Sequence, residues 1–401
     1  MPYLDDEPRK KKKPESRRDI ALDKFEMSSE SAPRKVKKSD KISGRRNQNP
    51  FVKFAVAAFP QADDPPSEKF RKAFLLMAVA VLIGALMFLG WQIFSIAKGD
   101  KLNNELANIA GNPINNNGSY RQPDHIANPD ANIATSAGTE EPEFIDLTPV
   151  VNTPLNINFD ELIKRNPDTR GWICITDTMI NNVIVQSTDN DYYLNHDFDG
   201  NESISGTIFS SYLNKWDGTD DNTILFGHNM TSGQFFAYVM HYVPNDKSRE
   251  PIAFYKVHPT IMMATPDGGS ETYKIFAGMI CNTQEQYGEV FDYITKTKFE
   301  NAADFNNYIL DVMDRSWFFT DVDLKYGDEL LTLSTCYWPL GKQVDTRWVV
   351  LARKVRPGES EYVDTSKAYR NYQAKLFDYY YDRINGTWSG SVWDRSKLLS
   401  Y

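Results

Sequence analysis

An uninterrupted apolar segment, Ala73–Trp91, constrains this chain more than any other feature of the sequence. It has no polar side chain, and no charged residue occurs between residues 73 and 97. A helix needs about 20 apolar residues to cross the hydrocarbon core of a membrane. The segment is apolar on every side, whereas a buried helix of a soluble protein has a polar face. It is longer than the apolar region of a cleavable signal peptide and begins after 72 residues, so we predict a transmembrane signal-anchor helix over residues 73–97.

Charge is distributed unevenly on the two sides of this segment. Residues 1–72 contain 19 basic and 12 acidic residues, whereas residues 98–401 contain 26 basic and 42 acidic residues. Basic residues next to a span favour the cytoplasmic side, and Lys69, Arg71 and Lys72 stand at its N-terminal end. We therefore predict a single-pass protein of the cell membrane, with a cytoplasmic N-terminus and the C-terminal portion outside.

The basic tail, residues 1–72, has few large apolar residues before Phe51 and is predicted to be largely disordered. Such a tail is also compatible with nucleic-acid binding. Beside a membrane span, however, it favours a role in topology and contact with anionic lipid, and we predict no nucleic-acid partner.

The portion after the span divides by composition into three parts. Residues 98–155 are rich in Asn, Pro, Gly, Ala and Thr and predict an extracellular stalk, whose first turns are compatible with a continuation of the membrane helix. Residues 156–357 predict a folded domain that opens with a short helical pattern, Phe159–Arg165. Residues 358–401 predict an aromatic-rich C-terminal extension that is partly helical, around Ser366–Tyr380.

The folded domain has the pattern of a mostly β protein. Short apolar runs rich in Ile, Val, Thr, Phe and Tyr are separated by turn signals, which favours a β-barrel or a sandwich. Helices are predicted over Gln234–Tyr242 and Asn301–Trp317, because the apolar residues of the second segment fall on roughly one face. The eight runs are Trp172–Thr176, Val183–Gln186, Thr207–Phe209, Thr223–Phe226, Thr260–Thr265, Tyr273–Cys281, Leu330–Thr335 and Trp348–Lys354.

Three cysteines are an odd number for an extracellular domain, which leaves at least one thiol free. Cys174 and Cys281 lie within or at the end of apolar runs and are interpreted as core residues. Cys336 closes the run Leu331–Cys336, where a side chain reaches both core and solvent. Chemistry alone favours neither of two interpretations, a Cys336 packed in the core and a Cys336 that reacts.

A nucleophilic thiol needs a cation nearby to favour the thiolate. His228 follows an apolar run that breaks at Gly227, so it stands at a strand end as Cys336 does. Arg347 begins the next run after Cys336, and a hairpin would bring the two together. A structural histidine and a surface arginine are the plain alternatives for these two residues.

Taken in order, these residues resemble the sortase family. The motifs are Gly227-His-Asn-Met230, Thr332-Leu-Ser-Thr-Cys336 and Thr346-Arg347, behind a signal anchor. Gly171-Trp-Ile173, Val185-Gln186, Asp189-Asn190, Tyr193-Leu194, Gly206-Thr-Ile-Phe209 and the long helix between the last strands are similar to the class B branch. The resemblance covers about residues 155–355 and implies a closed eight-stranded sortase-type β-barrel with added helices. Phe226 departs from the tyrosine that many relatives have there.

The resemblance implies a cysteine transpeptidase that anchors surface proteins to the cell wall of a Gram-positive bacterium. Cys336 would attack the carbonyl of a threonine in a sorting pentapeptide, His228 would transfer protons, and Arg347 would donate hydrogen bonds to the substrate. An amine of a peptidoglycan precursor, of the lipid II type, would resolve the thioester. The partners implied are secreted proteins with a C-terminal sorting signal. Substrate-binding residues suggested by the resemblance are Ser334, Thr335, Asn190 and Leu194.

Three other functions are alternatives to this one. A sortase that polymerises pilins would use the same catalytic residues. A papain-like hydrolase places its cysteine before its histidine, which is the reverse of the order here. A membrane-tethered binding module would only pack Cys336.

No metal or cofactor is predicted. The cysteines and histidines lack ligand spacing, and no glycine-rich phosphate loop is present. The acidic loop Asp217–Asp221 lacks the full pattern of a calcium loop.

Overall fold

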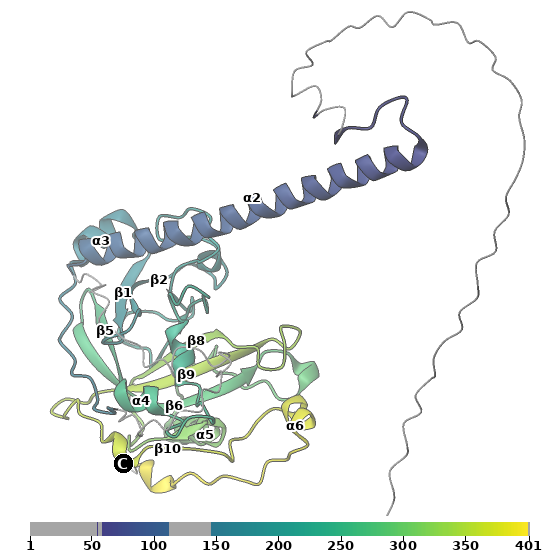
Figure 1. Ribbon diagram of the computed structural model, residues 1–401. Helices are drawn as coiled ribbons and strands as arrows, with labels where there is room; N and C mark the ends of the chain where they lie inside the picture. The colour runs from purple at the N-terminus through teal and green to yellow at the C-terminus, as the bar shows by residue number, and fades with distance from the viewer. Residues whose placement is uncertain (1–53, 55–57, 112–145, 400–401) are drawn as a thin grey trace, which may run out of the picture. The chain divides into compact units, whose positions relative to one another are not determined.

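Eight strands close into a β-barrel in the computed structural model, which describes residues 54, 58–111 and 146–399. They follow one another around the barrel in the order β1-β2-β3-β4-β8-β9-β6-β5. Figure 1 labels β1, β2, β5, β6, β8 and β9 among them. Each strand overlaps one of the eight predicted runs, and the predicted closed barrel is confirmed. Their bounds are Thr169–Cys174 (β1), Asn181–Val185 (β2), Phe209–Ser210 (β3), Asn222–Phe226 (β4), Thr260–Thr265 (β5), Gly269–Asn282 (β6), Leu330–Cys336 (β8) and Thr346–Lys354 (β9).

The pairing of β4, β8 and β9 determines which strand ends meet. β4 and β8 are parallel, with Phe226 opposite Ser334, so both strands finish at the same end of the barrel. β8 and β9 form an antiparallel hairpin, so β9 begins at that end. Residues after Phe226, the last residues of β8 and the first residues of β9 are therefore brought together although they lie far apart in the sequence.

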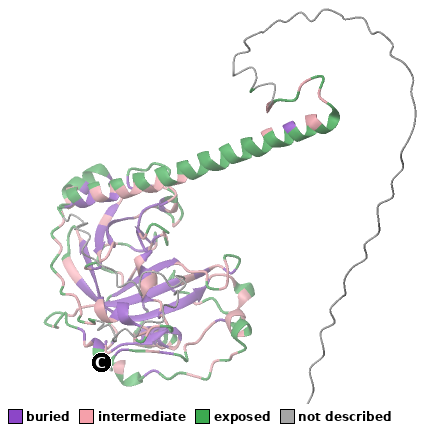
Figure 2. Ribbon diagram, viewed as in Figure 1, coloured by how far each residue is buried: buried purple, intermediate pink, exposed green. Residues whose placement is uncertain are grey.

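Two hydrophobic clusters lie on the two faces of the central strands, as the buried strands in Figure 2 show. In β9, Trp348, Val350 and Ala352 face one cluster, whereas Val349 and Leu351 face the other. Side chains alternate across a strand, and a strand buried on both faces has a continuous apolar sequence. This explains why the run is apolar without a period of two.

Helix α5, Ala302–Arg315, covers the second cluster, as predicted. The side chain of Asn301 accepts hydrogen bonds from the backbone N–H groups of Ala303 and Asp304 and so caps the helix. Other predicted helices differ from the structure. Only a 3-10 turn, η2 (Tyr238–Tyr242), forms within the segment predicted as helix from Gln234, because Gly233 and Phe235 have positive φ angles of 84° and 52°.

The C-terminal extension is partly helical, as predicted, but the helical stretch expected around Ser366–Tyr380 is wrong in its bounds. It contains a 3-10 turn, η4 (Thr365–Lys367), then strand β10 (Tyr369–Arg370), and only then helix α6 (Asp378–Ile384). β10 pairs with β7 (Phe318–Phe319) in a separate two-stranded sheet. β10 thus pairs with β7, whose two phenylalanines are buried, where the local pattern favours a helix. The remaining elements are α3 (Phe159–Arg165, as predicted), η1 (Tyr192–Leu194), α4 (Ala253–Val257), η3 (Glu285–Tyr287) and η5 (Arg395–Lys397).

Helix α2, Pro66–Ile109, contains the predicted span and extends past it. Among the described residues it is the one helix long and apolar enough to cross a membrane, and most residues of its apolar segment are exposed (Figure 2). The chain divides into a unit that ends at Ala78 and a unit of Val79–Tyr401. Within the second unit, Leu106, Ala107 and Ala110 at the end of α2 are buried in a cluster with Trp172 of β1.

The first residues of the predicted stalk are therefore helical and packed. Most of the predicted tail (1–53 and 55–57) and residues 112–145 of the stalk lie outside the described residues.

Candidate active site

Cys336 and Arg347 lie opposite each other at one end of the β8–β9 hairpin. Cys336 is the last residue of β8, and Arg347 is the second residue of β9. Both are half-buried, since the loop of residues 337–345 leaves them partly open to solvent. The hairpin predicted from the sequence is thus formed.

Backbone contacts place His228 beside the end of β8. The N–H of Gly227 donates to the Ser334 carbonyl at 3.3 Å, and the Thr335 hydroxyl donates to the Gly227 carbonyl at 2.8 Å. On the other side of His228, the Asn229 amide donates to the Cys336 carbonyl at 3.1 Å. His228 is therefore held next to the end of β8, because both of its neighbours in the chain, Gly227 and Asn229, are hydrogen-bonded there.

Gly227 is required by close packing at this turn. A Cβ atom built there would lie 2.8 Å from the Phe236 ring. The break in the apolar run at Gly227, seen in the sequence, reflects this close approach.

The imidazole of His228 is oriented by the backbone. Its Nε2 lies 2.8 Å from the carbonyl oxygen of Leu194, in η1. A carbonyl only accepts, so Nε2 carries a proton, and Nδ1 is the ring nitrogen left for proton transfer. Sequence reasoning left this orienting partner unassigned. No side-chain signal could have found it, because the acceptor is a main-chain atom.

Arg347 uses only part of its guanidinium within the protein. Nη1 donates to the Asp345 carboxylate at 2.5 Å and to the Thr346 carbonyl at 3.1 Å. Nε and Nη2 have no hydrogen-bond partner in the part of the chain that the structure describes. An arginine has five N–H donors, so three remain for a substrate oxygen.

Asp345 was not singled out from the sequence, although it stands two residues before Arg347. Its carboxylate accepts from Thr283 Oγ1 at 2.9 Å and from Trp338 Nε1 at 3.2 Å. Its backbone N–H donates to Gln284 Oε1 at 3.0 Å. The acidic partner of Arg347 is therefore fixed from both sides.

The charges around the three cysteines differ, since Asp177 raises the pKa of Cys174 and Arg315 lowers that of Cys281, each by less than burial changes it. Burial raises the pKa of Cys174 and Cys281 to about 12. Burial also raises the pKa of Cys336, but the positive charge of Arg347 opposes this and the negative charge of Asp345 adds to it. All three cysteines are free.

The four residues predicted to bind substrate have other contacts. The Ser334 hydroxyl is buried and lies 2.7 Å from Tyr293 Oη, and the Thr335 hydroxyl is bonded to Gly227 as described above. Asn190 Oδ1 accepts from the Tyr212 N–H at 3.0 Å. Leu194 reaches the site through its carbonyl. Roles in binding substrate stay a prediction for all four residues.

The acidic loop Asp217–Asp221 uses its carboxylates for its own structure. Asp217 accepts from the N–H of Thr219 within the loop, Asp220 accepts from the N–H groups of Lys215 and Trp216 just before it, and Asp221 accepts from the N–H of Phe299. Among the described residues, no three His, Cys, Asp or Glu side chains gather as a set of metal ligands.

Comparison with known proteins places the chain in a family. The family model described as a sortase domain matches residues 175–355. The curated Sortase B of Listeria monocytogenes is 33% identical over 186 residues, which cover 46% of this chain and 70% of that protein. The chain belongs to the sortase family. Sortase B of Staphylococcus aureus is 29% identical over 178 residues, covering 44% of this chain and 67% of that protein.

Solved sortase B structures are also similar. The X-ray structure of Clostridium perfringens sortase B is 32% identical and covers 50% of this chain and all of that chain, with a TM-score of 0.43. The family model and the curated relatives support the class B assignment and an enzyme of the cysteine transpeptidase type. The matched family domain ends at residue 355, so the C-terminal extension lies outside it.

Proposed function

We propose that this sortase cleaves a sorting pentapeptide after its threonine and transfers the acyl group to an amine of a peptidoglycan precursor. The observation that carries the proposal is the register of Cys336 with Arg347, beside a His228 that is held at the end of β8. The three free N–H donors of Arg347 add support, because an oxyanion needs such donors. Secreted proteins with a sorting signal are the acyl donors in this proposal.

The proposed reaction has two half-reactions. In the first, the Cys336 thiolate attacks the threonine carbonyl carbon, the peptide C–N bond breaks, and the His228 imidazolium gives its proton to the leaving amine. The product is a thioester on Cys336. In the second, the incoming amine attacks the thioester, His228 accepts the proton from that amine, and the C–S bond breaks. Arg347 stabilises the oxyanion of both tetrahedral intermediates.

Anchoring in the membrane by α2 is part of the proposal. The exposed apolar side chains of α2 and the basic residues before it favour a span with the N-terminus inside the cell. Protease treatment of intact protoplasts tests this orientation. An antibody to the C-terminal domain should lose its signal, whereas an antibody to residues 1–53 should keep it. The opposite pattern would reject the orientation.

Ligation of a labelled sorting peptide to an amine tests the reaction. Cys336→Ala should abolish ligation, and Cys281→Ala is the matched control that should retain it. His228→Ala should also fail while its far-ultraviolet circular dichroism is unchanged. Full ligation by Cys336→Ala would refute the proposal. If the peptide is cleaved but never joined to an amine, the family's transferase reaction is absent and hydrolysis is the activity.

A further inference from the structure

The C-terminal extension lies against the loop between β6 and α5. The ring of Tyr379, in α6, lies 4.9 Å from the ring of Tyr287, measured between centroids. Lys375 Nζ forms an ion pair with Glu289 at 2.8 Å. A Cβ atom built on Gly288 would lie only 2.7 Å from the backbone nitrogen of Asp378. The extension and this loop are therefore in direct contact.

The extension itself is fixed to the barrel domain. The Asn371 side chain, which is buried, donates to the Ser316 carbonyl at 2.7 Å. The Arg370 guanidinium lies 4.9 Å from the centre of the Trp317 ring. Phe377 is buried in the main core cluster. The segment that contacts the loop is thus anchored on both sides of Lys375.

The other side of the same loop contacts the residues that lead into Arg347. Tyr287 Oη donates to the Gln343 carbonyl at 3.2 Å. Gln284 and Thr283, at the start of the loop, hold the backbone and carboxylate of Asp345. Asn282 donates to the carbonyls of Gln284 and Gly288, which closes the loop into one unit. The loop is therefore held between the extension and the partner of Arg347.

We propose that the C-terminal extension is a positioning element of the active site. It fixes the loop of residues 283–291, and the loop fixes Asp345 and thereby the guanidinium of Arg347. The extension lies outside the matched family domain, and its sequence alone indicates no role. The proposal gives it one. The inference rests on the proposed role of Arg347. Packed side chains and hydrogen bonds of this kind carry coupling between sites.

Variants of the full chain in detergent test the proposal. Tyr379→Ala removes the ring over Tyr287, whereas Tyr379→Phe keeps it. Lys397→Ala is the matched control, because Lys397 lies in the same extension but pairs with Asp321 instead of the loop. Tyr379→Ala should lower kcat about 3–30-fold with little change in KM, and Tyr379→Phe and Lys397→Ala should stay near wild type.

Two further readouts separate positioning from general destabilisation. In an Asp345→Asn background, Tyr379→Ala should lower kcat by less than it does alone, because both changes act on the same guanidinium. Hydrogen exchange of residues 283–291 should become faster in Tyr379→Ala and not in Lys397→Ala, and this readout needs no activity. Unchanged exchange and unchanged kcat in Tyr379→Ala would overturn the inference, as would an equal loss in Lys397→Ala. Failure of Arg347→Ala to affect ligation would instead overturn the proposed function.

Discussion

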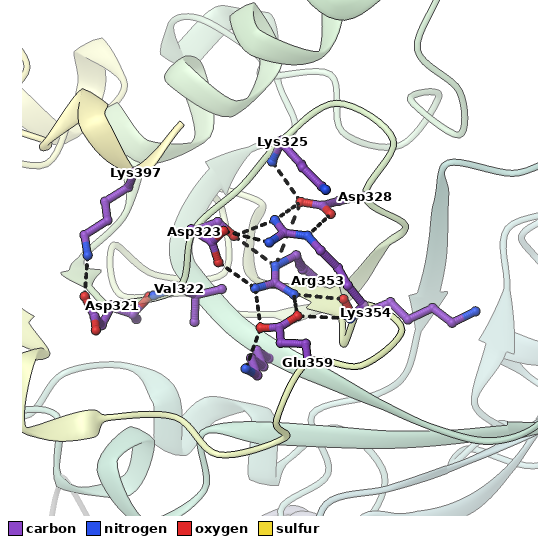
Figure 3. A network of polar contacts seen from close by, with 12 residues as sticks. Asp321, Val322, Asp323, Lys325, Asp328, Arg353, Lys354, Glu359 and Lys397 are labelled. Carbon is purple, nitrogen blue, oxygen red and sulfur yellow. Dashed lines mark hydrogen bonds and ion pairs between the residues drawn. The ribbon is translucent and has the colours of Figure 1, made fainter. Parts of the chain in front are cut away.

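Strand β9 has an arginine near each of its ends, and the protein uses the two in different ways. Arg353 makes five hydrogen bonds, to Asp323, Glu359 and the Lys354 carbonyl, and its side chain is 1% exposed (Figure 3). Arg347 makes two, both through Nη1, and its side chain is 27% exposed. All five donors of Arg353 are used inside the protein, whereas three of the five donors of Arg347 have no partner among the described residues.

The difference separates a structural arginine from one available for chemistry. A buried charge is tolerated when every donor has a partner, and Arg353 meets this condition. Arg347 has a single carboxylate partner that fixes its position and leaves Nε and Nη2 for another molecule. The same side chain on the same strand therefore serves stability at one end of the barrel and is proposed to serve catalysis at the other.

Replacing Arg347 should have the largest effect on ligation. Removing one oxyanion donor costs about 3 kcal/mol of activation free energy, and so Arg347→Ala should lower kcat by about 100-fold to 1,000-fold. The free energy of unfolding should change little, because the side chain has few contacts inside the protein. Steady-state ligation and urea unfolding measure the two quantities. If Arg347→Ala were unstable but ligated normally when folded, Arg347 would be a structural arginine and the roles given to Arg347 and Arg353 would be wrong.

Replacing Arg353 should have the opposite effect. Arg353→Met removes the main partner of Glu359 and one of the two arginine partners of Asp323. Losing these hydrogen bonds to charged groups should cost about 1.5–3 kcal/mol of unfolding free energy. The kcat of the protein that remains folded should match wild type. Urea unfolding, followed by tryptophan fluorescence, tests the first part, and active-site titration corrects the second for unfolded protein.

Acid should weaken the Arg353 end of the barrel. Burial opposes ionisation of Glu359, but hydrogen bonds from Arg353 and Lys274 outweigh it and hold the pKa of Glu359 well below its usual range. A carboxyl with a lower pKa in the folded state stabilises the protein fully above the unfolded value of about 4.3, and this stabilisation is lost as the pH falls through the folded value. Thermal unfolding from pH 7 to pH 3 should show a falling midpoint below about pH 4.3. Glu359→Gln should flatten that fall, and an unchanged slope would contradict it.

Neutralising Asp345 should have the smallest effect of the four. Its negative charge raises the pKa of Cys336, so Asp345→Asn should move the pH dependence of Cys336 alkylation to lower pH. Iodoacetamide labelling across a pH series, read by mass spectrometry of the Cys336 peptide, measures the shift. A shift to higher pH would mean that loss of the Arg347 position outweighs loss of the charge.

The sequence predicts the Arg347 end of the barrel, but not the Arg353 end. The apolar runs predicted all eight barrel strands, and the order of His228, Cys336 and Arg347 predicted which residues meet at one end. The Arg353 network could not be predicted, because its carboxylates come from a loop near Asp323 and from Glu359 beyond the strand. The Leu194 carbonyl was equally hidden, since a main-chain acceptor has no sequence signal. The C-terminal helix was misplaced because β10 pairs with a distant edge.

The central claim is that Cys336, and neither Cys174 nor Cys281, forms the acyl intermediate. Intact-mass and peptide mass spectrometry of the chain mixed with a sorting peptide, without an acceptor amine, tests it directly. The account predicts a mass increase equal to the peptide acyl fragment on the Cys336 peptide, weaker in Arg347→Ala and absent in Cys336→Ala. An adduct on Cys174 or Cys281, or the same adduct in Cys336→Ala, would contradict it.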